Sequence, residues 1–234
     1  MRELTFHNKW LENEIRKSLK VYDGPITDED ALKVTFLDLS QVNLEYEDSN
    51  TLAEFKNLEE LNVVVQFEDM SFLSKFNKIK MLDIEFAMSY FDVKYLVTLK
   101  ELEEVFISGG LRSNFIFVNF ECIAQLPKLK LLHLHEFGSV DLAILKEMPY
   151  LTSFFCGYAE EVKNIDAISY LHNLEDLTLI DVTIQNLELF KPLKNEMYLD
   201  ICGLNIIEDV DLNELSRFRE CEVCENTVNG VWVP

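Results

Sequence analysis

A short apolar pattern recurs along almost the whole chain and restricts the folds that the chain can adopt. In the clearest copies, apolar residues stand at the first, fourth and sixth positions, as in LEELNV at residue 58, IKMLDI at 79 and LKLLHL at 129, whereas a weaker copy, EMYLDI at 196, begins with glutamate. Nine copies begin at residues 34, 58, 79, 102, 129, 151, 174, 196 and 218. The starts are 24, 21, 23, 27, 22, 23, 22 and 22 residues apart, which is too regular for chance. A period of this length indicates a repeat architecture.

Each copy is followed by a second apolar series with a step of three residues. Examples are LAEFKNL from Leu52, LAILKEM from Leu142 and LELFKPL from Leu187. This spacing suits a short helical turn, whereas the first series suits a strand whose alternate side chains face the core. The sequence therefore predicts an α/β solenoid of stacked copies, each made of a strand, a turn and a helical return. One copy buries too little apolar surface to fold alone, so stacking must stabilise the array.

The pattern resembles the leucine-rich repeat family in its short form of about 22 residues. The stretch before the first copy resembles the N-terminal cap of bacterial, internalin-like leucine-rich repeat proteins, because a helix, a turn with glycine and a helix start at ITDED precede the first strand. The resemblance implies an arc with a parallel sheet of about nine strands on its concave face. We expect one domain with three parts: a helical N-terminal cap at 1–33, the repeats at 34–223 and a C-terminal cap at 224–234.

The chain departs from this family at the ninth position of the copy, which asparagine usually holds. Val42, Phe137, Val182 and Leu204 stand there instead. The side-chain ladder that satisfies backbone groups at this position is therefore missing, and we expect irregular turns and local distortion.

Both ends of the chain carry signals for caps. Leu11, Ile15 and Leu19 recur every four residues and form the apolar stripe of a helix. A variant of the capping box, Thr27 with Asp30, indicates the start of a second helix. At the other end the sequence TVNGVW predicts a type I′ β-hairpin, whose tryptophan, residue 232, we expect to cover the last copy.

Composition limits the partners and the location. The 42 Asp and Glu residues outnumber the 21 Lys and Arg residues, for a formal charge of -21. Such a chain repels nucleic acid and anionic lipid and favours a basic partner. We find no apolar run typical of a signal peptide or a membrane span, so we expect a cytoplasmic protein without nucleic-acid or membrane partners. The five cysteines are odd in number and scattered, which favours reduced thiols over a disulfide framework.

Two histidines in LKLLHLHEF raise the question of a metal site. His133 and His135 stand at the fifth and seventh positions of one strand and face outward together. A metal ion would need at least a third protein ligand. The equivalent positions on the flanking strands are Phe106, Ser108, Phe155 and Gly157. We therefore expect an exposed histidine pair and no metal or other cofactor.

The cysteines near the C-terminus also allow a metal or redox reading. In CEVC, Cys221 stands at an inward position and Cys224 at an outward one, so the two thiols diverge. Cys202 and Cys224 share the seventh position of adjacent strands and should be close neighbours. We expect both to be free thiols in a reducing cytosol.

The fifth positions of the central copies form an aromatic row with acidic ends. A contiguous apolar patch with a polar rim is the expected form of a protein-binding site. We predict that the partner contacts Phe106, His133, Phe155, Leu131, His135, Ile180, Asp83, Glu85 and Asp200. Two alternatives stay open: the central rings could be purely structural, and Phe115 and Phe117 of the longest copy could belong to the core or to the rim of this face.

These observations favour a non-catalytic scaffold that holds a protein or peptide, basic in character, on the concave sheet. No serine, cysteine or histidine stands in a nucleophile motif, so an enzyme is the weakest reading. The alternative from another class is a structural or adhesin-type repeat module like those of internalins.

Overall fold

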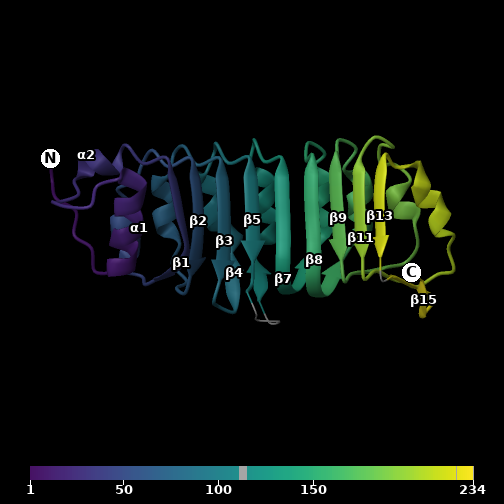
Figure 1. Cartoon of the computed structure of the whole chain (residues 1–234). Coiled ribbons are helices and arrows are strands. Elements are labelled where there is room, and N and C mark those ends of the chain that lie inside the picture. Colours follow the sequence, from purple (N-terminus) through teal and green to yellow (C-terminus); the bar gives the residue numbers. More distant parts are fainter. Residues whose placement is uncertain (111–114, 225, 234) are drawn as a thin grey trace.

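The strands of the repeats lie side by side in one large parallel sheet, as a computed structural model shows for residues 1–110, 115–224 and 226–233 (Figure 1). In this described part of the chain, nine strands follow one another in chain order, and each begins at the third position of a copy. They are β1 (Phe36–Leu44), β2 (Glu60–Val65), β3 (Met81–Phe86), β5 (Glu104–Ser108), β7 (Leu131–Asp141), β8 (Ser153–Lys163), β9 (Asp176–Ile180), β11 (Tyr198–Cys202) and β13 (Glu220–Cys224). The predicted repeat solenoid is confirmed.

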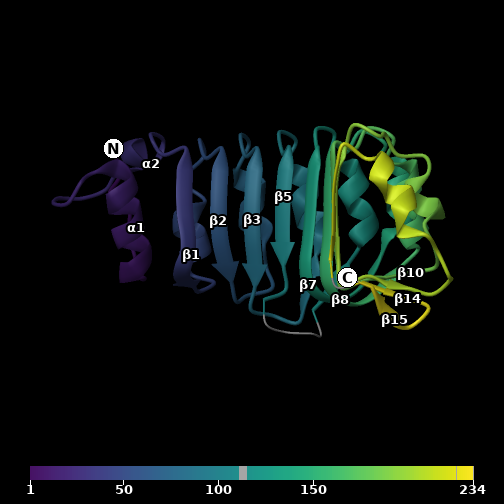
Figure 2. The same cartoon turned by 45° about the vertical axis from the view of Figure 1, so that its right-hand side comes forward.

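The chain returns behind the sheet in short helices (Figures 1 and 2). They are α3 (Asp48–Leu52) and 3₁₀ helices at Ser71–Lys75, Val93–Thr98, Phe120–Gln125, Leu142–Glu147, Ile165–Tyr170, Glu188–Phe190 and Leu212–Arg217. The apolar step of three matches the three residues per turn of a 3₁₀ helix. Leu142 and Leu145 accordingly face the core together. No helix among the described residues is both long and apolar enough to cross a membrane.

One continuous apolar core lies between the sheet and the returns. In the first eight copies the side chains at the fourth and sixth positions are buried, as at Leu132 and Leu134. The last copy differs, because Cys221 and Val223 at these positions stay partly exposed. The core therefore ends at a copy that no further strand covers in the described part of the chain.

Apolar side chains take the place of the asparagine ladder. Val42, Phe137, Val182 and Leu204 are all buried. The expectation of irregular turns is wrong for the later copies, where the residue before this position is left-handed four times in succession, at Glu136, Tyr158, Asp181 and Gly203. In three of these turns the next side chain is buried, at Phe137, Val182 and Leu204. Asp181 and Gly203 also donate backbone hydrogen bonds to the following copy, at 2.9 and 3.0 Å. A register shift within β1, between Leu39 and Leu44, is the local irregularity that the structure does show.

Two groups of short strands follow these turns. After the turns of the last copies, the chain forms a second sheet in the order β10 (Thr183–Ile184), β12 (Asn205–Ile206), β14 (Asn226–Val228) and β15 (Val231–Val233). In the middle of the array, β4 (Tyr90–Asp92) pairs with β6 (Ile116–Val118).

The longest copy is anchored by phenylalanines. Phe115 is buried and stacks on Phe86 with ring centroids 5.4 Å apart, while Phe117 packs edge-on against Phe115 and is half-buried. Of the two alternatives left open by the sequence, Phe115 belongs to the core. Residues 111–114 of this insertion lie outside the described part of the chain.

The N-terminal cap closes the first edge of the sheet. It contains α1 (Lys9–Leu19), which buries Leu11 and Ile15, and α2 (Asp28–Ala31), which starts at the predicted capping box. Asn8 Nδ2 donates to the carbonyl oxygen of Asn43 at 3.0 Å, and Ser18 Oγ donates to that of Phe36 at 3.3 Å. The cap thus supplies hydrogen-bond donors to the outer edge of β1 as well as apolar cover.

The C-terminal hairpin forms as predicted but does not cover the last copy. Asn229 and Gly230 have φ angles of 49° and 75°, as a type I′ turn requires, and join β14 to β15. Trp232 is 61% exposed, so the expectation that it covers the array is wrong. The reason is that the hairpin extends the second sheet, beyond the carboxyl ends of the large one (Figure 2), and does not lie across β13.

Candidate functional site

Three rings from the fifth repeat position lie together on the sheet face. β5, β7 and β8 pair in register, so Phe106 is beside His133 and His133 is beside Phe155. The rings of His133 and Phe155 are stacked, with centroids 3.8 Å apart and 4° between their planes. Phe106 lies on the other side of His133 at 5.3 Å. Neighbouring strands thus build the aromatic centre that the sequence predicts, and all three rings remain half-buried.

The absence of a side chain at Gly157 on β8 makes room for the ring of Phe155. A Cβ atom at Gly157 would meet Cε1 of Phe155 and Cβ of Ile180, each at 3.1 Å. The space of the missing side chain is therefore occupied by Phe155 and bordered by Ile180. The apolar surface thereby continues from β8 to β9.

The rings line a shallow hollow of about 440 Å³ on the sheet face. Six of the nine residues predicted for the site line this hollow: Asp83, Phe106, His133, His135, Phe155 and Ile180. The other three, Leu131, Glu85 and Asp200, occupy outward positions of the same sheet beside it. Six of the predicted residues therefore share one hollow, and whether a partner contacts all nine stays a prediction.

Tyr158 lines the hollow and was missed by the sequence reasoning. Its ring meets that of His135 edge-on, with centroids 4.9 Å apart, and 47% of the residue is exposed. The residue has a φ angle of 56°, and this left-handed conformation breaks the alternation from which outward positions are assigned. No pattern in a single sequence marks a left-handed tyrosine.

Burial sets the charge of the histidine at the centre. It lowers the pKa of His133 to about 4, and the neighbouring His135 adds to the effect. His133 is therefore neutral near pH 7 and presents an uncharged aromatic ring. Its in-register neighbours Phe106 and Phe155 offer no metal ligand. Within residues 1–110, 115–224 and 226–233, no three His, Cys, Asp or Glu side chains gather closely enough to hold a metal ion.

Carboxylates flank the rings along the same row. Burial raises the pKa of Asp83, and the nearby Glu85 and Asp38 add to the rise. Burial likewise raises the pKa of Asp200, with Glu222 as the second cause. No ion pair formed between described residues includes Asp83 or Asp200, since the sheet's lysines pair elsewhere, as Lys130 does with Glu103. The row therefore presents carboxylates whose charge a basic partner could neutralise.

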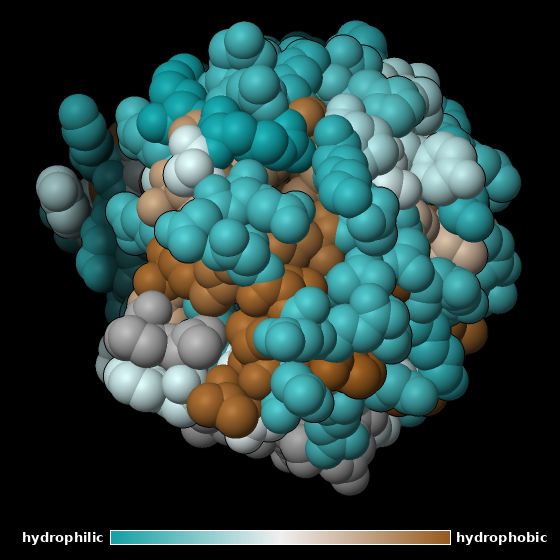
Figure 3. All heavy atoms as spheres, turned by 90° about the vertical axis from the view of Figure 1, so that its right-hand side faces the viewer, coloured by the Kyte–Doolittle hydropathy of each residue, from teal (hydrophilic) through white to brown (hydrophobic). Residues whose placement is uncertain are grey.

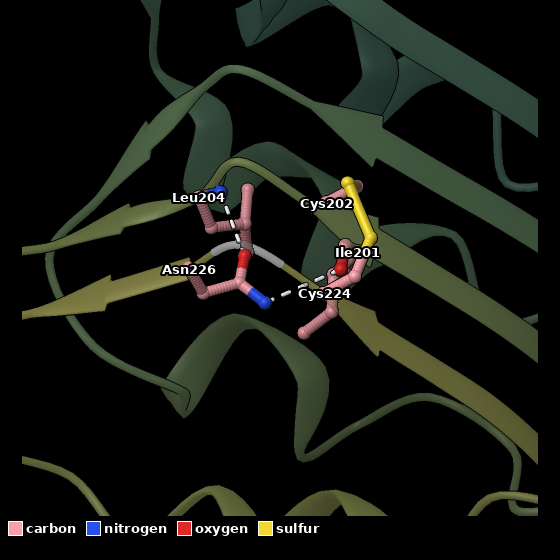
Figure 4. Close-up of a disulfide and its surroundings, with 5 residues drawn as sticks. All are labelled: Ile201, Cys202, Leu204, Cys224 and Asn226. Carbon is pink, nitrogen blue, oxygen red and sulfur yellow. Dashed lines mark hydrogen bonds between the residues drawn. A yellow bond between two sulfur atoms is a disulfide. The ribbon is translucent and has the colours of Figure 1, made fainter. Parts of the chain in front are cut away.

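The cysteines at the seventh position form a disulfide. Cys202 and Cys224 are directly paired on β11 and β13, and their Cα atoms are 4.7 Å apart, within the range that a disulfide spans (Figure 4). The expectation of two free thiols is wrong, because parallel neighbours at one repeat position bring the two sulfur atoms together. Cys221, the other cysteine of CEVC, is a free thiol on the opposite side of the strand.

The last copy keeps the asparagine that the other turns have lost. Asn226 is fully buried at the ninth position, a signal that was present in the sequence and was overlooked. Its Oδ1 accepts from the backbone N–H of Leu204 at 2.7 Å, and its Nδ2 donates to the carbonyl oxygen of Ile201 at 3.3 Å (Figure 4). The disulfide and this side chain together fix the last strand to the copy before it.

Comparison with known proteins identifies the fold. No protein-family model matches the sequence, and no curated protein matches it. Among solved structures, internalin C2 from Listeria monocytogenes matches at 16% identity and a TM-score of 0.57 over 95% of this chain and 94% of its own. The leucine-rich repeat protein LIC12759 from Leptospira interrogans matches at 15% identity and a TM-score of 0.58, over 86% of this chain and 57% of its own.

The likeness extends to a plant receptor. The leucine-rich repeat ectodomain of the Arabidopsis receptor kinase HAESA, solved in complex with a peptide hormone ligand, matches at 14% identity and a TM-score of 0.59. It covers 87% of this chain and 36% of that one. Identities this low establish the fold alone. On the evidence of its repeats, its sheet and these neighbours, the chain is a solenoid with the leucine-rich repeat fold.

Proposed function

We propose that the chain is a non-catalytic scaffold that binds a protein or peptide on its concave sheet face. The observation that carries the proposal is the row of adjacent rings of Phe106, His133 and Phe155, which stays half-exposed in a hollow on that face. Adjacent aromatic rings with a polar surround are typical of the centre of a protein interface. Ser108 and His135 lie side by side in the hollow, but no hydrogen bond between described residues joins the serine hydroxyl to either histidine, so no catalytic step is assigned to the hollow.

The chemistry of the row favours a basic partner with an apolar or aromatic anchor. The neutral ring of His133 lets an apolar group enter the hollow without burying a charge. Asp83 and Asp200 lie on either side of the rings and can pair with lysine or arginine. The net charge of -21 also attracts basic proteins at long range and disfavours nucleic acid. The peptide complex of the HAESA ectodomain supports the proposal by analogy of fold.

Selection from a random peptide library displayed on phage tests this proposal. We expect the wild-type chain to enrich peptides that combine an aromatic or aliphatic residue with lysine or arginine. Phe106→Ala and Phe155→Ala should each weaken a selected peptide by more than about tenfold, because truncating a central aromatic typically costs at least 2 kcal/mol. Tyr170→Ala is the matched control, since this tyrosine is 48% exposed on a helical return behind the sheet.

The remaining outcomes decide the open alternative. If the two phenylalanine variants unfold by circular dichroism, the rings are structural. If both variants fold and bind like the wild type, the peptide contacts another surface and the proposed site is wrong. Asp83→Asn should leave affinity at physiological salt nearly unchanged but flatten its dependence on ionic strength, because a rim charge acts mainly through long-range attraction.

One observation favours the second candidate, a surface repeat module of internalin class. Disulfides persist mainly in oxidising compartments, and Cys202 and Cys224 are joined. The sequence, by contrast, predicts a cytoplasmic location. Alkylation of thiols in intact cells, followed by fractionation and immunoblotting, distinguishes the two. A reduced protein in the cytoplasmic fraction supports the intracellular scaffold, and an oxidised protein at the cell surface supports the second candidate.

A further inference from the structure

The two edge strands of the large sheet, β1 and β13, differ in what covers them. At the first edge, Asn8 and Ser18 of the N-terminal cap donate hydrogen bonds to backbone carbonyls of β1, and α1 covers the core. At the other edge, the strand order ends at β13, and no strand of the described residues pairs with its outer side. The hairpin of β14 and β15 extends the second sheet instead. An uncovered edge of five residues is unusual, because such an edge is a template for another strand.

The core is open at the same end. Cys221 and Val223 point inward from β13 but stay partly exposed, as do Val210 and Leu212 on the return before it. Figure 3 views this end directly and shows apolar surface in its middle with hydrophilic residues around it. The edge therefore combines unpaired backbone with apolar side chains on its inner face.

The open strand is fixed in place. The disulfide from Cys224 ties it to β11, and the buried side chain of Asn226 holds the turn that follows. Terminal repeats of a solenoid have only one neighbour to stabilise them. Because this edge is already ordered, it loses little conformational entropy of its own when a strand pairs with it.

Charge indicates what kind of strand fits. Between residues 208 and 224, six Asp and Glu stand against two Arg, so this end attracts basic side chains. Glu220 and Glu222 are exposed and face outward from β13. A second copy paired tail to tail would set these carboxylates against their own equivalents, which is unfavourable. A head-to-tail copy would need the outer edge of β1, which α1 already covers.

We propose that the free edge of β13 binds an extended segment of another protein in which basic and apolar side chains alternate, and that this segment adds to the sheet as a further strand. Its backbone pairs with the outer side of β13. Its apolar side chains cover Cys221 and Val223, and its basic side chains face Glu220 and Glu222. This site lies at the end of the array and is separate from the aromatic hollow.

A synthetic peptide of alternating lysine and valine is the probe, with the oxidised full chain as receptor. We expect it to bind at low ionic strength and to slow amide hydrogen exchange at residues 220–224. A glutamate and valine peptide should bind at least about tenfold more weakly. N-methylation of alternate amides, made in each of the two possible sets, should abolish binding in one set, because that set carries the donors to β13.

Two protein variants complete the experiment. Glu222→Lys should weaken the peptide by about tenfold, since it replaces an attraction by a repulsion. Tyr170→Ala, on a helical return away from both surfaces, should leave peptide affinity unchanged. The proposal is overturned if both N-methylated peptides bind as well as the parent, if bound peptide slows exchange in β5, β7 and β8 and not at residues 220–224, or if the peptide does not bind at all. Sedimentation showing a wild-type dimer that Glu222→Lys changes would assign the edge to a second copy instead.

Discussion

Replacing Asn226 by alanine should destabilise the end of the array far more than its small size suggests. The substitution removes the acceptor for the backbone N–H of Leu204 and the donor to the carbonyl of Ile201. Asn226 is 0% exposed, so water cannot replace these partners. An unsatisfied buried N–H costs about 1–3 kcal/mol, and a lost hydrogen bond about 0.5–1.5 kcal/mol. The expected loss of unfolding free energy is therefore about 2–4 kcal/mol.

Chemical denaturation and amide hydrogen exchange measure this loss. Because each copy contacts only its neighbours, we expect exchange to rise first around residues 201–204 and to remain slow in the central copies. Asn205→Ala is the matched control: the same residue type in the preceding copy is exposed and should change stability by no more than about 0.5 kcal/mol. An Asn226→Ala variant as stable as this control, with unchanged exchange at Leu204, would refute the reasoning.

Three further predictions concern the cap, the central histidine and the cysteines. Deletion of residues 1–33 should yield aggregated protein, because it exposes the apolar core. Light scattering that finds a soluble monomer, together with a normal melting transition in calorimetry, would contradict the assignment of these residues as a cap. The folded-state pKa of His133, about 4 against a usual 6.5, means that the unfolded chain takes up the proton first. Stability should therefore fall as pH drops from about 6.5 towards 4, and less so in His133→Phe when the two proteins are compared by denaturation. Thiol titration of the denatured, unreduced protein should find three of the five cysteines free, because Cys202 and Cys224 are paired, and five free thiols would count against the bond.

The repeat pattern of the sequence was sufficient to predict most of the fold. The spacing of apolar residues located each copy, and one large-sheet strand begins at the third position of every copy. The spacing also predicted the inward positions, since burial on one side of a strand fixes which residues face the core. The same alternation brought Phe106, His133 and Phe155 together, because parallel strands in register align equal positions. These features follow from local periodicity, which a sequence records directly.

What the sequence did not reveal depends on contacts between copies or on backbone conformation. The left-handed turn that brings Tyr158 into the hollow has no signature in residue type, and the second sheet arises from strands only two or three residues long. The sequence correctly predicted that Cys202 and Cys224 are neighbours. It predicted free thiols because a reducing cytosol was expected, and the compartment cannot be read from contacts within the chain. Trp232 was expected to cover the last copy and is exposed instead, because a hairpin signal does not state where the hairpin packs.

The unequal ends of the sheet also determine how such an array can change its length. The N-terminal cap occupies the edge of β1, so a copy inserted before it would have to displace the cap's hydrogen bonds. The strand of a copy of about 22 residues added after β13 would pair with the free edge of β13 and cover its partly exposed apolar residues. Growth by duplication, in evolution or by design, is therefore easiest at the C-terminal end. A chain lengthened there should be more stable than the present one, because every added copy covers the copy before it.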